Sequence, residues 1–126
     1  MDDVRCRQWV DSVLGTLSLK ERIGQLFIYT IAPYQDKGNK ELLRKVVEDY
    51  KVGGLLFSGG LMQNQAILTN EAQRMADIPL LITFDGEWGL SMRLRGTPVF
   101  PKNMVLGCIQ NDTLLYEYGR EMARQC

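Results

Sequence analysis

The 126-residue chain is 45% hydrophobic and 24% charged, which is the balance of one globular domain with a buried core and excludes a disordered tail. Its 15 basic and 15 acidic residues give zero net charge, so we expect neither nucleic acid nor a membrane surface as a partner. The sequence contains no histidine, which excludes a complete Ser-His-Asp triad, a Cys-His dyad and a histidine-bearing zinc site within these residues.

The beginning of the chain predicts two helices followed by a strand. Apolar side chains recur at helical spacing over residues 2–17, which indicates an amphipathic helix. Ser18 and Glu21 form the sequence pattern of a capping box, so a second helix should begin there. The short apolar run 26–31 is typical of a buried strand. The buried stripe of the second helix is expected to comprise Leu19, Ile23 and Leu26.

The rest of the chain alternates predicted strands with amphipathic helices. The further helices are predicted over residues 40–51, 64–76 and 112–124. The further strands are predicted over residues 54–58 and 78–85. We expect Asn39 and Asp112 to cap helices, and Gly53-Gly54 to stop one. Residues 86–111 show no clear periodicity.

The fold class predicted from this alternation is α/β. Strands begin about every 27 residues with a helix inside each interval, which favours parallel βαβ units. A parallel sheet rarely stops after three strands. Residues 1–126 are therefore expected to be one incomplete domain, a truncated part of a larger sheet.

Chemistry is expected where the strands end, because ligands of parallel sheets sit at the carboxyl ends of the strands. Asp85 ends the third strand, and Glu87, Trp88 and Arg93 follow it. A carboxylate and a guanidinium could grip a polyhydroxylated ligand while Trp88 stacks on a sugar ring. The alternative is that Asp85 caps a turn and the arginine is a surface charge.

Two other functional interpretations of the residues near the strand ends are not favoured. Asp85 and Glu87 lie too close in sequence for the acid/base pair of a glycosidase, whose carboxylates flank the scissile bond. Ser58-Gly59-Gly60 could cradle a phosphate, but it lacks the established glycine motifs, and a tight turn between strand and helix is favoured.

No cofactor or metal is predicted. Cys6, Cys108 and Cys126 lack any CxxC spacing and are expected to be incidental thiols. The chain opens on Met1-Asp2-Asp3, which is unlike a secretory leader. A cytoplasmic protein and a mature periplasmic or secreted one whose leader is omitted both stay open.

Ordered short motifs run along nearly the whole chain. They are Trp9-Val10-Asp11, Ser18 to Phe27, Gly53 to Phe57, Thr69-Asn70 with Gln73, Ile78 to Ile82, Asp85 to Gly89 with Arg93-Leu94, and Phe100 to Met104 with Leu106-Gly107. With this order and spacing, the sequence resembles the amino-terminal part of glycoside hydrolase family 3, and most of all its β-N-acetylhexosaminidase branch.

The resemblance implies a (β/α)8 barrel and a retaining enzyme that removes terminal β-linked N-acetylglucosamine from a glycan or cell-wall fragment. It implies that Asp85 binds sugar hydroxyls and that Arg93 helps to hold the sugar. Glu87 matches an acidic position of the family and is expected to support the site, whereas Trp88 stands where the branch usually has glycine. The family's catalytic residues lie further along, so none is expected in this chain.

A barrel of this type takes about 250 residues, so 126 residues hold about three of its eight strands. The piece alone is expected to be inactive and to self-associate through the unpaired edges of its outer strands, with the contact near Leu81 or Thr83. The alternatives are a β-glucosidase-type member of the same family, a small non-catalytic α/β binding module, and an interaction domain in which the charges lie merely on the surface.

Overall fold

The computed structural model describes residues 3–125 and has mixed α/β architecture. Its sheet has three parallel strands in the order β1-β2-β4. The strands are β1 (Ile28–Ile31), β2 (Gly54–Phe57) and β4 (Leu81–Thr83). Ile28 pairs with Gly54 and Gly54 with Leu81 in the register. The predicted α/β class with parallel strands is therefore confirmed, with each strand shorter than predicted.

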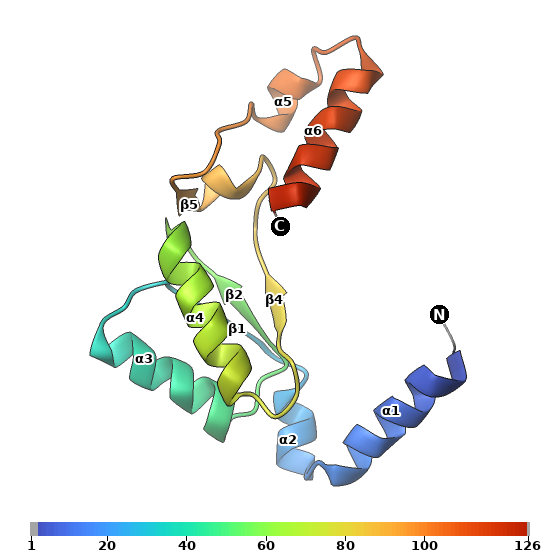
Figure 1. Ribbon diagram of the computed structural model, residues 1–126, viewed down its shortest axis with the longest axis vertical. Coiled ribbons are helices and arrows are strands. Elements are labelled where there is room, and N and C mark those ends of the chain that lie inside the picture. Colours follow the sequence, from blue (N-terminus) through green and yellow to red (C-terminus); the bar gives the residue numbers. More distant parts are fainter. Residues whose placement is uncertain (1–2, 126) are drawn as a thin grey trace.

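Helices connect the strands and extend the chain at both ends (Figure 1). They are α1 (Asp3–Thr16), α2 (Leu19–Gly24), α3 (Lys37–Arg44), the π-helical turn η1 (Lys45–Asp49), α4 (Met62–Met75), α5 (Asn103–Leu106) and α6 (Asp112–Gln125). In Figure 1, α1 projects away from the sheet, whereas α5 and α6 lie together beyond the short strand β5 (Leu94–Arg95). The region without clear periodicity thus contains the 3₁₀ turn η2 (Leu90–Met92), strand β5 (Leu94–Arg95) and α5.

The core lies where α3, η1 and α4 cover the sheet. Phe57 and Leu55 of β2 are fully buried, because this strand is central and has a neighbour on either side. The cluster of buried side chains comprises Ile31, Leu43, Val46, Val47, Val52, Leu55, Phe57, Leu68, Ala72 and Leu80. Strands β1 and β4 each leave one edge unpaired within the described residues. Leu81 of β4 is 60% exposed.

The capping box at the start of α2 is confirmed. The Ser18 hydroxyl accepts from the Glu21 backbone N–H at 3.3 Å, and the Glu21 carboxylate accepts from the Ser18 backbone N–H at 2.8 Å. The predicted burial of this helix is wrong, since Leu19 is 75% exposed and Leu26 83% exposed. Ile23 is also exposed, and no residue of α1 is buried. The apolar stripes of both helices are therefore uncovered in the described part of the chain.

The predicted cap Asn39 lies inside α3, not at its start. Asp36 caps the helix by accepting from the Asn39 backbone N–H at 2.9 Å. The Asn39 side-chain amide instead donates to the carbonyls of Ala32 and Tyr34, both at 2.8 Å. It therefore fixes the loop that follows β1. At the last helix, Asn111 accepts from the Thr113 backbone N–H at 3.0 Å, where the prediction placed the cap at Asp112.

Gly53 and Gly54 do not stop a helix. The π-helical turn ends before them, and Lys51 adopts the left-handed conformation with φ of 51°. A Cβ on Gly53 would lie 2.1 Å from the Gln25 carbonyl oxygen, and one on Gly54 would lie 2.5 Å from the Leu81 carbonyl oxygen. Glycine is needed here because the chain before β1 and strand β4 approach this backbone closely.

Candidate functional site

The loops that follow β1, β2 and β4 gather at the carboxyl ends of the strands, where parallel sheets hold their ligands. Asp85 comes two residues after β4, and the Arg93 guanidinium donates to its carboxylate. Each side chain of this ion pair is 41% exposed. The structure therefore brings together the two residues that the sequence singled out, and leaves both accessible to a ligand.

A tight turn carries Arg93 back to Asp85. Gly89 has φ of 94°, which a side chain would strain, and its N–H donates to the Gly86 carbonyl at 3.0 Å. The 3₁₀ turn η2 follows, and the Arg93 N–H donates to the Leu90 carbonyl at 3.0 Å. A Cβ on Gly89 would also lie 2.9 Å from the Phe100 ring, so the turn is packed against the segment before α5. The sequence 85–93 thus folds back on itself.

The aromatic residue of this loop has a cationic partner. The Lys102 ammonium lies 5.4 Å from the centre of the Trp88 ring, within the range of a cation–π contact. Trp88 is half-buried, whereas Glu87 beside it is exposed. The supporting role that the resemblance implies for Glu87 stays a prediction.

Sequence reasoning missed two partners of the site. Lys102 stands in a segment without periodicity, so nothing in the local pattern marked its contact with Trp88. The sequence predicts a tight turn at Ser58-Gly59-Gly60, yet this segment leads into the two-residue strand β3 (Gly60–Leu61). This strand pairs with β5 beside Arg93. The two adjacent glycines indicated that another segment of backbone could pack closely against this loop. The tertiary fold shows that this segment is Arg93 and strand β5.

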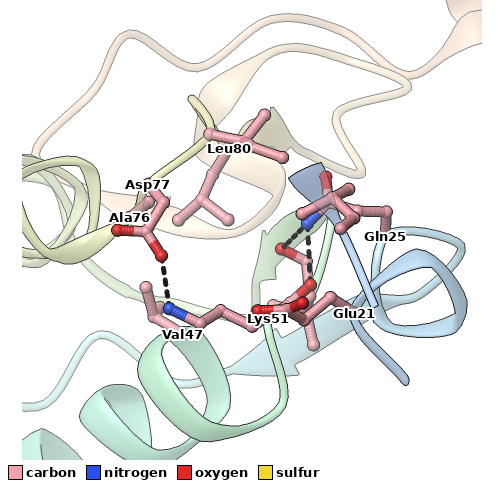
Figure 2. Close-up of a pocket in the computed structure, with 10 residues that line it drawn as sticks. Glu21, Gln25, Val47, Lys51, Ala76, Asp77 and Leu80 are labelled. Carbon is pink, nitrogen blue, oxygen red and sulfur yellow. Dashed lines mark hydrogen bonds and ion pairs between the residues drawn. The ribbon is translucent and has the colours of Figure 1, made fainter. Parts of the chain in front are cut away.

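A second group of charged residues lies at the opposite end of the sheet (Figure 2). Lys51 precedes β2, Asp77 precedes β4, and they form an ion pair, whose hydrogen bond raises the pKa of Lys51 above its ordinary value. Gln25 donates to the Lys51 and Val52 carbonyls at 2.7 and 3.4 Å, as the dashed lines in Figure 2 show. The cavity between these residues has room for about one water molecule (20 Å³). This cavity is therefore too small for a sugar, and the contacts around it join structural elements.

The residues 3–125 contain no group of three or more acidic or cysteine side chains placed to hold a metal ion. Cys6 and Cys108 are exposed free thiols, and Cys126 lies outside the described residues. In the same part of the chain, no helix has the length and apolar character to cross a membrane.

A comparison with models of protein families identifies the family of this chain. The model of the glycosyl hydrolase family 3 N terminal domain matches residues 18–126, which is most of the chain. The chain belongs to glycosyl hydrolase family 3. No curated protein matches it.

Membership of glycosyl hydrolase family 3 places the chain among the glycoside hydrolases. The parallel β1-β2-β4 sheet agrees with the barrel-like amino-terminal domain of that family. The matched range begins at the capping residue Ser18 and includes Asp85 and Arg93. Helix α1 precedes it.

Proposed function

We propose that this chain forms the first three βα units of the (β/α)8 barrel of a retaining β-N-acetylhexosaminidase. Membership of glycosyl hydrolase family 3 supports the glycosidase class, and the resemblance of the sequence to the hexosaminidase branch supports the sugar. The observation that carries the proposal is the half-exposed Asp85–Arg93 pair at the carboxyl end of β4. The substrate is a terminal β-linked N-acetylglucosamine of a glycan or cell-wall fragment.

Each residue of the site has a chemical role in holding the sugar. The Asp85 carboxylate accepts hydrogen bonds from sugar hydroxyls, and the Arg93 guanidinium donates to sugar oxygens. Their mutual ion pair orients both groups before the sugar arrives. Trp88, with the Lys102 ammonium 5.4 Å from the centre of its ring, supplies an aromatic side chain at the rim. These residues bind the sugar and take no part in bond cleavage.

The bond-breaking groups come from elsewhere in the barrel. Retaining glycosidases place two catalytic groups on either side of the scissile bond, with carboxylates about 5 Å apart when both are acids. Asp85 is already paired with Arg93, and Glu87 is exposed on the same loop. We therefore assign the nucleophile and the acid/base to residues beyond Cys126, and expect residues 1–126 alone to be inactive.

The specific alternative is a β-glucosidase-type enzyme of the same family. Trp88 departs from the glycine usual in the hexosaminidase branch, and this bulky residue would reshape the rim of the pocket. The two functions differ in the group that the pocket must accept at carbon 2 of the sugar, an acetamide or a hydroxyl.

Hydrolysis of two matched substrates tests the proposal. The complete polypeptide and residues 1–126 are each given an aryl β-N-acetylglucosaminide and the corresponding aryl β-glucoside. We expect the complete polypeptide to cleave the N-acetylglucosaminide with the higher kcat/KM, and residues 1–126 to cleave neither. Preference for the glucoside would favour the alternative enzyme. Turnover that stays with residues 1–126 through repurification would overturn the assignment of the catalytic groups.

A further inference from the structure

The backbone of Arg93 is held by the loop that follows a different strand. The Gly60 N–H donates to the Arg93 carbonyl at 3.0 Å. Strand β3 then runs parallel to β5, with Gly60 opposite Leu94 and Leu61 opposite Arg95. A Cβ on Gly59 would come within 3.1 Å of the same Arg93 carbonyl oxygen. The loop after β2 therefore fixes the point from which the Arg93 side chain starts.

The loop that follows β1 closes on Gly60 from another direction. Pro33 of that loop has a fully buried side chain. A Cβ on Gly60 would lie 2.3 Å from Pro33 Cγ and 3.0 Å from its Cδ, but 3.5 Å from its Cβ. The glycines with positive φ are Gly89 and Gly96, so backbone conformation does not require glycine at position 60. Space beside the Pro33 ring requires it.

We propose that Gly60 is a positioning residue for Arg93, and that Pro33 and Gly60 together set the distance between the Arg93 guanidinium and Asp85. An alanine at position 60 must move by more than about 1 Å to reach ordinary contact with the Pro33 ring. A shift of that size breaks a 3.0 Å hydrogen bond to the Arg93 carbonyl. Without this hydrogen bond to its backbone, Arg93 shifts, and its guanidinium moves away from the Asp85 carboxylate. The consequence for sugar binding rests on the function proposed above.

Three variants of the 126-residue chain test the positioning directly. Gly60→Ala introduces the clash, and Pro33→Ala with Gly60→Ala removes the ring while keeping the 3.5 Å contact between the two Cβ atoms. Gly119→Ala is the matched control, because a Cβ at this position of α6 meets nothing within 4 Å. The readout is the ¹⁵N signal pattern of the Arg93 guanidinium, whose terminal nitrogens give separate signals when an ion pair slows their rotation. Thermal unfolding shows whether each variant is folded.

We expect Gly60→Ala to lose the separate Arg93 signals, the double variant to regain them, and Gly119→Ala to keep them. A folded Gly60→Ala chain with unchanged Arg93 signals would overturn the proposal. If Gly60→Ala does not fold, the double variant decides: it must fold and show the separate signals, and failure on either point contradicts the proposal.

The same variants in the complete polypeptide connect positioning to the enzyme. Misplacing a binding group by about 1 Å can cost up to about a hundredfold in rate. We expect Gly60→Ala to lower kcat/KM for an aryl β-N-acetylglucosaminide by at least about tenfold, and the double variant to restore most of it. Lost Arg93 signals with unchanged kcat/KM would uphold the positioning by Gly60 and contradict the proposed role of Arg93 in binding sugar.

Discussion

Replacing Asp85 by Asn should weaken sugar binding and leave the stability of the protein almost unchanged. The substitution keeps the shape of the side chain but removes the charge that faces Arg93. Each side chain of the pair is 41% exposed, and ion pairs at exposed positions typically contribute only about 0–1 kcal/mol to folding. We therefore expect the free energy of unfolding to fall by less than about 1 kcal/mol.

The effect on substrate is larger, because a sugar would shield this pair from water. A hydrogen bond to a charged group is typically worth about 1.5–3 kcal/mol, which corresponds to roughly a tenfold to hundredfold loss of kcat/KM. The assay measures kcat/KM of the complete polypeptide on an aryl β-N-acetylglucosaminide, together with the urea midpoint of unfolding. Arg93→Ala should give a loss of similar size.

Asp77→Asn is the matched control, because Asp77 forms an ion pair with Lys51 at the opposite end of the sheet. It should leave kcat/KM unchanged. Two results would contradict the proposed role of Asp85 and Arg93 in binding the sugar. One is an unchanged kcat/KM in both Asp85→Asn and Arg93→Ala. The other is an Asp85→Asn variant destabilised by several kcal/mol, which would make the ion pair a structural element.

The remaining predictions concern the core, the capping box and the assembly state. Phe57→Ala should destabilise the chain by about 3–5 kcal/mol in urea unfolding, because the side chain is fully buried on the central strand; a loss below about 1 kcal/mol would contradict the described core. Hydrogen bonds from Ser18 hold the pKa of Glu21 below its ordinary value of 4.5. The stability that they supply is present above that value and is lost as the pH falls through the lowered pKa; Ser18→Ala should raise the Glu21 midpoint toward 4.5 in a carboxyl ¹³C titration, and an unmoved midpoint would contradict the cap. Residues 1–126 should form dimers or larger assemblies in sedimentation, and Leu81→Lys should shift them toward monomer because Leu81 is 60% exposed on β4, a strand with one unpaired edge in the described part of the chain. A cooperative monomer of the unaltered chain at high micromolar concentration would contradict this.

Much of the fold could be predicted because it depends on local patterns. Apolar runs and helical periodicity marked β1, β2, β4, α4 and α6 to within a few residues, and the capping box marked the start of α2. Their alternation was enough to predict parallel pairing, since a helix between two strands returns the chain to the end of the sheet where the first strand began, and the next strand then runs in the same direction. Asp85 and Arg93 could be proposed as a pair because they share one loop after β4.

What could not be predicted depends on contacts between distant segments. The role of Asn39 is set by the carbonyls of Ala32 and Tyr34, which reach it only when the loop after β1 has folded back. The need for glycine at position 60 comes from Pro33, 27 positions earlier in the sequence. The exposure of Leu19 could not be predicted either. An apolar stripe on a helix predicts burial against a partner, and the described residues supply no such partner.

A crystal structure of the complete polypeptide with N-acetylglucosamine bound tests the central claim most directly. We expect the sugar at the carboxyl ends of β1, β2 and β4, with its hydroxyls donating to Asp85 and its oxygens accepting from Arg93. A sugar bound elsewhere, with the Asp85–Arg93 pair undisturbed, would contradict it.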